Sequence, residues 1–144
     1  EKIGWRLTIV RTFSKNVLYI PNTAFSSIIV ENATRMSNRR INETIGIRYD
    51  DLSKMSEIIE DVNKSLLENT DIDQTQKAKV YFKSFSASSC DFFIYAFTIT
   101  KDWEEFLKIK QSVLLNIAQI ISKHKAEIAY PTSTVYLNKD ISRQ

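Results

Sequence analysis

Residues 39–67 read RRINETIGIRYDDLSKMSEIIEDVNKSLL, and the spacing of their apolar side chains changes halfway along. The first ten residues place isoleucines at alternating positions, which is typical of a half-buried strand. From Leu52 the apolar residues recur at steps of three and four, which predicts a helix that ends near Glu68. Two aspartates at the change, Asp50 and Asp51, are candidate N-caps of this helix.

Further elements follow this helix along the chain. The polar stretch 69–76 is predicted to be a loop, and the alternation in 79–85 predicts a strand. Residues 92–100, FFIYAFTIT, are rich in aromatic and β-branched side chains, which favours a largely buried strand. Asp102, with Glu105 three positions later, forms a capping box at the start of the longest helix.

That helix is expected to end near Lys123, and residues 128–130 form one more short predicted strand. From residue 41 the order is therefore strand, helix, strand, strand, helix, strand. This order is typical of the ferredoxin-like α+β arrangement, in which two helices cover one face of an antiparallel sheet.

The residues before 41 predict an all-β piece. A strand over 3–10 and a strand over 17–20 form a hairpin whose loop is Ser14-Lys15-Asn16, with Asn16 able to take a positive φ. A further short strand is expected at 27–31. Three or four strands are too few to close a barrel, so we expect another strand or another subunit to complete this piece.

The composition sets broad limits on what the chain can be. Its 144 residues, 43% hydrophobic and 26% charged, suit one ordinary globular domain or two small ones. A net charge of +3 is compatible with an anionic partner but does not require one. The chain begins without Met, inside a predicted strand, and we expect it to be a piece cut from a longer protein.

Few residues could support catalysis or hold a metal. Cys90 and His124 are the single Cys and the single His, and they are predicted to lie in a hairpin turn and at a helix end. A nucleophile and its base must share a pocket, so a turn thiol and a helix-end cation is the favoured interpretation. A zinc site needs more Cys or His ligands. Asp71 and Asp73 are interpreted as a solvated loop rather than a cation site.

The densest basic cluster consists of Arg35, Arg39 and Arg40. It could contact a phosphate or another anion, or it could protect an exposed strand edge with charge, and the second interpretation is favoured. RNA-recognition domains share the predicted element order, but their glycine- and aromatic-containing sheet motif is absent from residues 81–87. The aromatic residues of 92–97 are assigned to the core. We therefore expect no enzyme and no catalytic, cofactor or metal site.

An ordered set of short motifs resembles the small-conductance mechanosensitive channel (MscS) family, in particular its YnaI-like subgroup of larger members. The motifs, in chain order, are Gly4-Trp5-Arg6, Arg11-Thr12, Ile20-Pro21-Asn22, Glu31-Asn32, Ser37-Asn38-Arg39-Arg40-Ile41, Ile45-Gly46-Ile47-Arg48-Tyr49-Asp50, Ser88-Ser89, Thr100-Lys101-Asp102-Trp103 and Tyr130-Pro131-Thr132-Ser133-Thr134. The resemblance covers nearly the whole chain, and its specificity comes from the ordered set rather than from any single motif.

The resemblance implies a fold and an arrangement. Residues 1–40 would be an N-terminally truncated Sm-like β-domain, 41–130 a ferredoxin-like domain, and 131–144 a C-terminal barrel strand and tail. Members of this family carry pore-lining transmembrane helices first and assemble as heptamers. The channel lies in the bacterial inner membrane. On its cytoplasmic side the seven subunits form a hollow vestibule with side portals. Opening under tension releases ions and small solutes on hypo-osmotic shock.

The resemblance also implies roles for individual residues. Pro21-Asn22 matches the family's β-domain turn. Pro131-Thr132-Ser133-Thr134-Val135-Tyr136-Leu137 matches the strand that forms a small heptameric barrel, with either parity toward its lumen. Two positions depart from the family pattern. Ala33-Thr34 stands where relatives often have a Pro, and Lys125 stands where many have the Gly of a helix stop.

Two alternative functions remain open from the sequence. One is an Sm-like RNA-binding module, which the net positive charge allows. RNA binding that depends steeply on salt concentration would support it. The other is a stand-alone domain that binds a small regulatory ligand. The resemblance instead favours a homo-oligomeric vestibule that supplies assembly and solute filtering. Helices outside this chain would connect it to the membrane. We expect it to need no nucleic acid and no cofactor.

Overall fold

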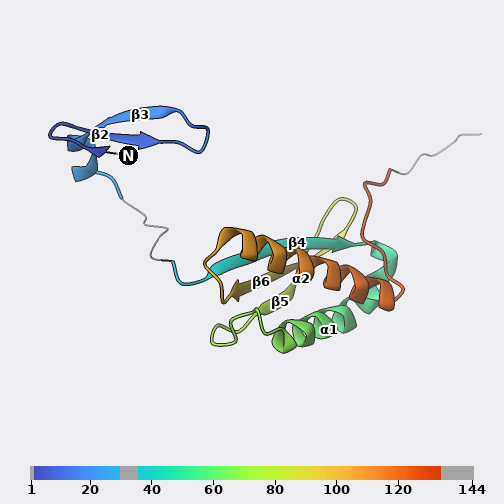
Figure 1. Ribbon diagram of the computed structural model, residues 1–144. Coiled ribbons are helices and arrows are strands. Elements are labelled where there is room, and N and C mark those ends of the chain that lie inside the picture. Colours follow the sequence, from blue (N-terminus) through green and yellow to red (C-terminus); the bar gives the residue numbers. More distant parts are fainter. Residues whose placement is uncertain (1, 30–35, 134–144) are drawn as a thin grey trace, which may run out of the picture. The chain divides into compact units, whose positions relative to one another are not determined.

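The computed structural model describes residues 2–29 and 36–133. These residues form two compact units, which meet in the sequence between Met36 and Ser37 (Figure 1). The first unit is a small antiparallel sheet, and the second combines three strands with two long helices. The chain is therefore a mixed α/β protein with two small antiparallel sheets.

The first unit has three strands in the order β1-β2-β3 and a short helix. Its elements are β1 (Lys2–Ile3), β2 (Leu7–Arg11), β3 (Val17–Pro21) and η1 (Asn22–Ser26). A single strand over 3–10 was the wrong prediction, because the chain turns back after Ile3, which pairs with Thr8. The turn is closed by the Gly4 N–H, which donates to the Leu7 carbonyl over 2.9 Å.

The hairpin loop differs from the predicted one in length and in its left-handed residue. Arg11 pairs with Val17, so the loop spans 12–16 rather than 14–16. Lys15 takes the positive φ, 69°, in place of Asn16. The reason is the Thr12 hydroxyl, which accepts the Asn16 N–H at 3.2 Å and so fixes the end of the loop.

The prediction of a strand at 27–31 is wrong for residues 27–29, which follow η1 without joining the sheet. Residues 30 and 31 lie outside the described part. No side chain of residues 2–29 is buried, so the described part of this unit has no hydrophobic core of its own.

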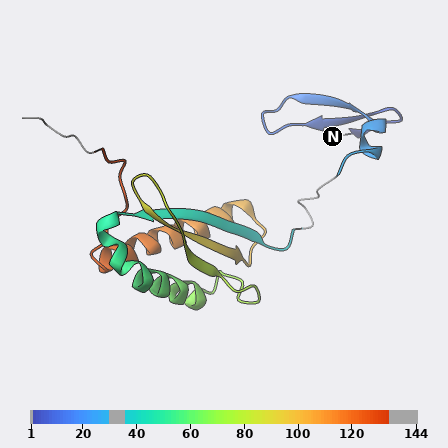
Figure 2. The same cartoon turned by 180° about the vertical axis from the view of Figure 1, so that it is seen from behind.

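The second unit contains a three-stranded antiparallel sheet and two α-helices. Its elements are β4 (Arg39–Ile47), η3 (Tyr49–Lys54), α1 (Met55–Glu68), β5 (Lys79–Phe85), β6 (Cys90–Thr98) and α2 (Trp103–Lys123). The strand order is β4-β6-β5. The short strand predicted at 128–130 is only a single bridge between Ile47 and Ile128, beside the outer edge of β4. Seen from behind, the strands lie in front of α2 (Figure 2).

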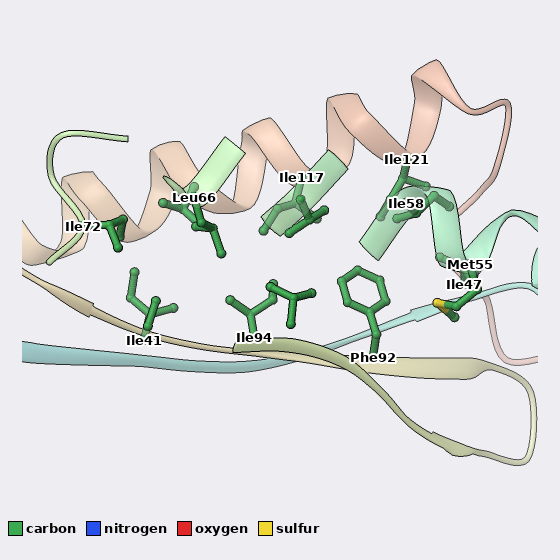
Figure 3. Close-up of a cluster of buried hydrophobic side chains, with 14 of the residues drawn as sticks. Ile41, Ile47, Met55, Ile58, Leu66, Ile72, Phe92, Ile94, Ile117 and Ile121 are labelled. Carbon is green, nitrogen blue, oxygen red and sulfur yellow. The ribbon is translucent and has the colours of Figure 1, made fainter. Parts of the chain in front are cut away.

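The core lies between the sheet and the two helices. The apolar stripe predicted for the first helix points into it, because Ile58, Val62 and Leu66 of α1 are almost fully buried. The side chains of Ile117 and Ile121 from α2 are almost fully buried as well. Buried side chains of the sheet, including Ile41, Phe92 and Ile94, pack against these helix residues (Figure 3). Burial of these side chains is the main favourable contribution to folding of this unit.

The sheet buries only one of its faces. Along β6 the residues alternate between buried and partly buried, so Phe92 lies in the core. The other face carries Phe93, Tyr95 and Phe97, which are only partly buried. Their assignment to the core was therefore wrong. The reason is that both helices lie on one side of the sheet, so the second set of aromatic side chains has no covering layer.

The start of α2 and the end of α1 at Glu68 agree with the sequence, whereas the start of α1 does not. The Asp102 carboxylate accepts the Glu105 N–H over 2.9 Å, which confirms the predicted cap. Neither Asp50 nor Asp51 caps α1, because both lie in the 3-10 helix η3 and the N-cap of α1 is Lys54. At the far end of α2, Lys125 takes a φ of 54° and continues the chain in the left-handed region.

Candidate functional site

The chain after α2 is fastened to the end of β4 and to the β5–β6 turn. The Arg48 N–H donates to the Glu127 carbonyl over 3.2 Å, and the Ala129 N–H donates to the Gly46 carbonyl over 3.0 Å. The Thr132 N–H reaches the Ser88 hydroxyl over 3.4 Å. We call residues 126–133 and the groups that hold them the C-terminal junction.

The predicted barrel strand begins at this junction. Its first residues, Pro131, Thr132 and Ser133, are exposed and lie outside regular secondary structure. The remaining residues, Thr134, Val135, Tyr136 and Leu137, lie outside the described part of the chain. The barrel strand therefore stays a prediction.

A buried carboxylate, Asp51, is the centre of the C-terminal junction. Its side chain is only 5% exposed and pairs with Lys54 over 2.7 Å and with Arg48 over 3.1 Å. The Glu127 N–H also donates to it over 3.1 Å. The Lys54 ammonium in turn donates to the Lys125 carbonyl over 2.7 Å. The hydrogen bond from Lys54, together with those from Glu127 and Arg48, lowers the pKa of Asp51 to about 2.

A second set of contacts shapes the turn that receives Thr132. Asp91 accepts hydrogen bonds from the hydroxyls of Ser86 and Ser89, which also lower its pKa. This turn folds closely over Gly46, where an added Cβ would lie 2.7 Å from the Ser89 Cβ. Gly46 is therefore required by close approach, a role that its place in the sequence motif did not reveal.

In the first unit Asn22 holds the predicted turn together. Its side-chain amide donates to the carbonyls of Gly4 at 2.9 Å and Trp5 at 3.0 Å, and its Oδ1 accepts from the Thr8 hydroxyl at 2.8 Å. Pro21 is the last residue of β3 and pairs with Leu7. These contacts give the Pro21-Asn22 pair a structural role in this unit.

The basic cluster is only partly within the described residues, since Arg35 is outside them. The Arg39 guanidinium donates to the Lys101 carbonyl over 2.8 Å and lies 5.0 Å from the Trp103 ring. The Arg40 guanidinium lies 5.7 Å from the Tyr95 ring on the open side of the sheet. Arg39 is thus engaged within the unit, and contact of this cluster with an anion stays a prediction.

Cys90 and His124 occupy different environments. Cys90 is the fully buried first residue of β6, not the predicted turn thiol, and this burial raises its pKa. His124 caps the C-terminal end of α2, as the sequence predicts, and binds Asp61 on α1 over 3.0 Å. Its other ring nitrogen lies 3.4 Å from Glu57. These contacts connect the two helices.

The acidic loop also has a local structural role. Asp73 accepts hydrogen bonds from the Thr75 hydroxyl and N–H and from the Asn38 amide, and these bonds lower its pKa. The Asp71 carbonyl accepts the Ile99 N–H over 3.1 Å. Within residues 2–29 and 36–133 no three His, Cys, Asp or Glu side chains come together in a way that could hold a metal ion.

The uncovered side of the second sheet is aromatic and basic. Tyr81 and Phe93 lie 6.1 Å apart between ring centroids, and Tyr95 meets Phe97 edge-on at 5.4 Å. Lys79 lies 6.0 Å from the Tyr95 ring. Lys83 donates to the Thr44 hydroxyl over 3.1 Å. We call this surface the aromatic sheet face. It consists of Arg40, Lys79, Tyr81, Lys83, Phe93, Tyr95 and Phe97.

Among the helices of the described residues, none is both long enough and apolar enough to span a bilayer. Comparison with known families gives two matches in chain order. Residues 1–35 match the mechanosensitive ion channel beta-domain, and residues 41–128 match the C-terminal region of the mechanosensitive ion channel MscS.

Individual relatives agree with these matches. The chain is 46% identical over 137 residues to the low conductance mechanosensitive channel YnaI of Escherichia coli, covering 95% of this chain and 40% of that protein. Arabidopsis thaliana MSL1 superposes with a TM-score of 0.84 at 26% identity, over 90% of this chain and 47% of that one. Helicobacter pylori MscS in its closed state shares the fold, with a TM-score of 0.76 at 18% identity over 97% and 54% of the two chains.

The chain thus spans less than half the length of its curated relative from E. coli. None of these matches supports the RNA-binding or ligand-binding alternatives. With the C-terminal model alone matching more than half of the residues, the chain belongs to the MscS family of mechanosensitive ion channels.

Proposed function

We propose that this chain is the cytoplasmic vestibule part of a bacterial mechanosensitive channel that releases ions and small solutes on hypo-osmotic shock. The observation that carries the proposal is the pair of family matches, beta-domain first and C-terminal region second, which together cover 1–35 and 41–128. The pore and the tension sensor would lie in membrane helices outside this chain, in the inner membrane. The chain itself would supply assembly and filtering rather than catalysis.

The finer fold proposed is a partial Sm-like β-domain over 1–40, a ferredoxin-like domain over 41–130, and a C-terminal strand and tail over 131–144. The strand order supports the middle part. With the bridge of Ile128 to Ile47 beside β4, the order across the sheet becomes 128, β4, β6, β5. This is the order of a ferredoxin-like sheet in which the last strand has shrunk to one residue pair.

Seven copies are proposed to assemble around the conduction path. The first unit supports this assembly, because side chains such as Trp5 and Phe13 are 93% and 108% exposed and the described residues of this unit form no core. Large exposed apolar side chains favour burial against a partner. The barrel strand 131–137 would extend from the C-terminal junction. The cluster Arg35, Arg39, Arg40 would protect a strand edge with charge, and contact with an anion is its alternative role.

A chimera tests this function directly. The matching region of YnaI is replaced by this chain, and currents are recorded from membrane patches while suction is increased. We expect stretch-activated currents and improved survival of channel-deficient cells after osmotic downshock. The physical reason is that the vestibule must assemble around the relative's pore for the pore to conduct.

The matched control is the same chimera with Phe92→Ala, which opens a cavity in the core and should abolish assembly. A chimera that reaches the membrane at the level of YnaI itself and yet passes no current under tension would overturn the proposal. In that case the family membership would remain, but the vestibule function would not.

A further inference from the structure

The aromatic sheet face is predominantly basic. Arg40, Lys79 and Lys83 all lie on it, and the acidic residue at its end, Asp91, is held by two serine hydroxyls. At the end of this face where β5 begins, a shallow hollow of ≈ 400 Å³ is lined by Gln76, Lys77, Lys79, Tyr95 and Phe97. Tyr81 is 61% exposed beside it. An aromatic surface ringed by cations is suited to a partner with carboxylates.

The opposite charge lies on α1. Four carboxylates and one ammonium occupy positions 57, 60, 61, 64 and 68 of this helix. Steps of three, four and seven place all five on one stripe, about 16 Å long at 1.5 Å per residue. We call these residues the acidic stripe. It lies away from the buried side chains of α1, which are Met55, Ile58, Val62 and Leu66.

Part of the acidic stripe is already neutralised by α2. Asp61 pairs with Lys123 over 3.0 Å and with His124 over 3.0 Å. Glu57 has only the longer contact to His124 and keeps 71% of its side chain exposed. Glu60 and Glu68 are exposed as well. The stripe therefore presents carboxylates to solvent along its whole length.

The two surfaces match in length as well as in charge. Lys79 and Lys83 are four residues apart on β5, about 14 Å at 3.4 Å per residue. The acidic stripe is about 16 Å long. Both surfaces belong to the same unit. The helices lie on one side of the sheet (Figure 2), and the aromatic sheet face is on the other side. They cannot meet within one chain.

We propose that the acidic stripe of one copy packs on the aromatic sheet face of a second copy of this chain. Such a contact joins two different surfaces, so it is heterologous, and repeated copies close into a ring or continue as a filament. It would bury the aromatic rings that the helices leave uncovered. The inference rests on the proposed vestibule function and names the contact through which its α/β units associate.

Charge reversal tests the contact. One variant carries Lys79→Glu and Lys83→Glu, another carries Glu60→Lys and Glu68→Lys, and a third carries all four changes. The mass of each chain is measured by light scattering across a concentration series. We expect the wild type to associate, each two-site variant to need at least about tenfold higher concentration to do so, and the four-site variant to recover.

The most specific test mixes the two two-site variants with each other. The two two-site variants should fail to associate alone but should associate with each other, because reversed surfaces then face each other with opposite charge. Lys101→Glu with Lys108→Glu, two exposed lysines elsewhere on the unit, is the matched control and should leave association unchanged. Circular dichroism melting confirms that every variant is folded.

Several outcomes would overturn the inference. A wild-type chain that stays monomeric up to about millimolar concentration, or variants that associate as the wild type does, would exclude this contact. The same holds if the Lys79/Lys83 variant instead loses binding of a labelled single-stranded RNA that the monomeric wild type holds. The chimera's currents are measured separately, so failure of this contact and failure of the proposed function remain distinguishable.

Discussion

At the scale of single residues, the carboxylate of Asp51 does most to hold the C-terminal junction. It is nearly inaccessible to solvent and accepts from two cations and one backbone N–H. Arg48 directly precedes η3, Lys54 ends η3, and the N–H belongs to Glu127 in the chain after α2. Breaking such a buried set leaves uncompensated charge behind, which costs more than losing a surface pair. The residue therefore couples the start of α1 to the segment that leaves α2.

Asp51→Asn should lower the free energy of unfolding by about 2 kcal/mol at pH 7, since a pKa shift of one unit corresponds to about 1.4 kcal/mol. The folded-state pKa of about 2 lies below the reference value of 3.8. The stabilisation is thus present above pH 4 and disappears as the pH falls toward 2. Urea unfolding of both proteins across this range measures the difference, which should shrink toward zero.

The neighbouring Asp50→Asn is the control for this experiment, because Asp50 is exposed. Its stability should stay within about 0.5 kcal/mol of the wild type. If Asp51→Asn and Asp50→Asn behave alike at pH 7, or if their difference persists unchanged at pH 2, the ion pairs do not stabilise the junction as described.

At the scale of elements, the end of α2 is a helix stop built without glycine. The Lys125 N–H donates to the Ser122 carbonyl over 2.9 Å, and the Ala126 N–H donates to the Ile121 carbonyl over 3.1 Å. These two bonds form a Schellman motif, in which the left-handed residue is usually Gly. The sequence showed Lys125 at this position, and the structure shows that the stop forms despite the unfavourable backbone, at φ 54°.

Lys125→Gly should raise the free energy of unfolding by about 1 kcal/mol, because a side chain in the left-handed region costs about 1–2 kcal/mol and Gly loses some of this gain through its unfolded-state entropy. Lys125→Ala keeps the strained backbone and should bring no gain. Thermal unfolding of the three chains compares them directly. Equal melting temperatures for the Gly and Ala variants would show that the left-handed backbone carries no cost here.

Elements were predictable where the signal is local. The stripe of α1 and the cap of α2 depend on residues a few positions apart, and both predictions hold. The faces of β6 were not predictable, because apolar side chains occupy both parities and only the placement of the helices decides which is covered. Asp51 was taken for a cap because its partner Glu127 lies 76 residues away. Long-range contacts of this kind have no signature in a local sequence pattern.

At the scale of the whole molecule, the chain combines one unit with a core and one whose described residues, 2–29 and 36, form none. All of the fully buried apolar side chains of the described residues lie between Ile41 and Ala126. The shortage of strands before residue 41 had indicated an incomplete β piece, and the exposed Trp5 and Phe13 agree with it. The ordered family motifs revealed the context that these physical patterns could not supply.

This division predicts how the chain unfolds. A shortened chain that begins at Ser37 should melt within about 2 °C of the full chain, because it keeps the whole buried core that provides the cooperative free energy. The full chain with Phe92→Ala is the matched control. It should lose about 3–5 kcal/mol and melt well below both, since a large core side chain is removed.

Circular dichroism melting at several protein concentrations measures all three chains under the same conditions. A shortened chain whose melting temperature falls as far as that of the Phe92→Ala control would mean that residues before Ser37 contribute to the stability of the α/β unit. If only the full chain melts at a temperature that rises with concentration, the first unit takes part in association, as its uncovered apolar side chains favour.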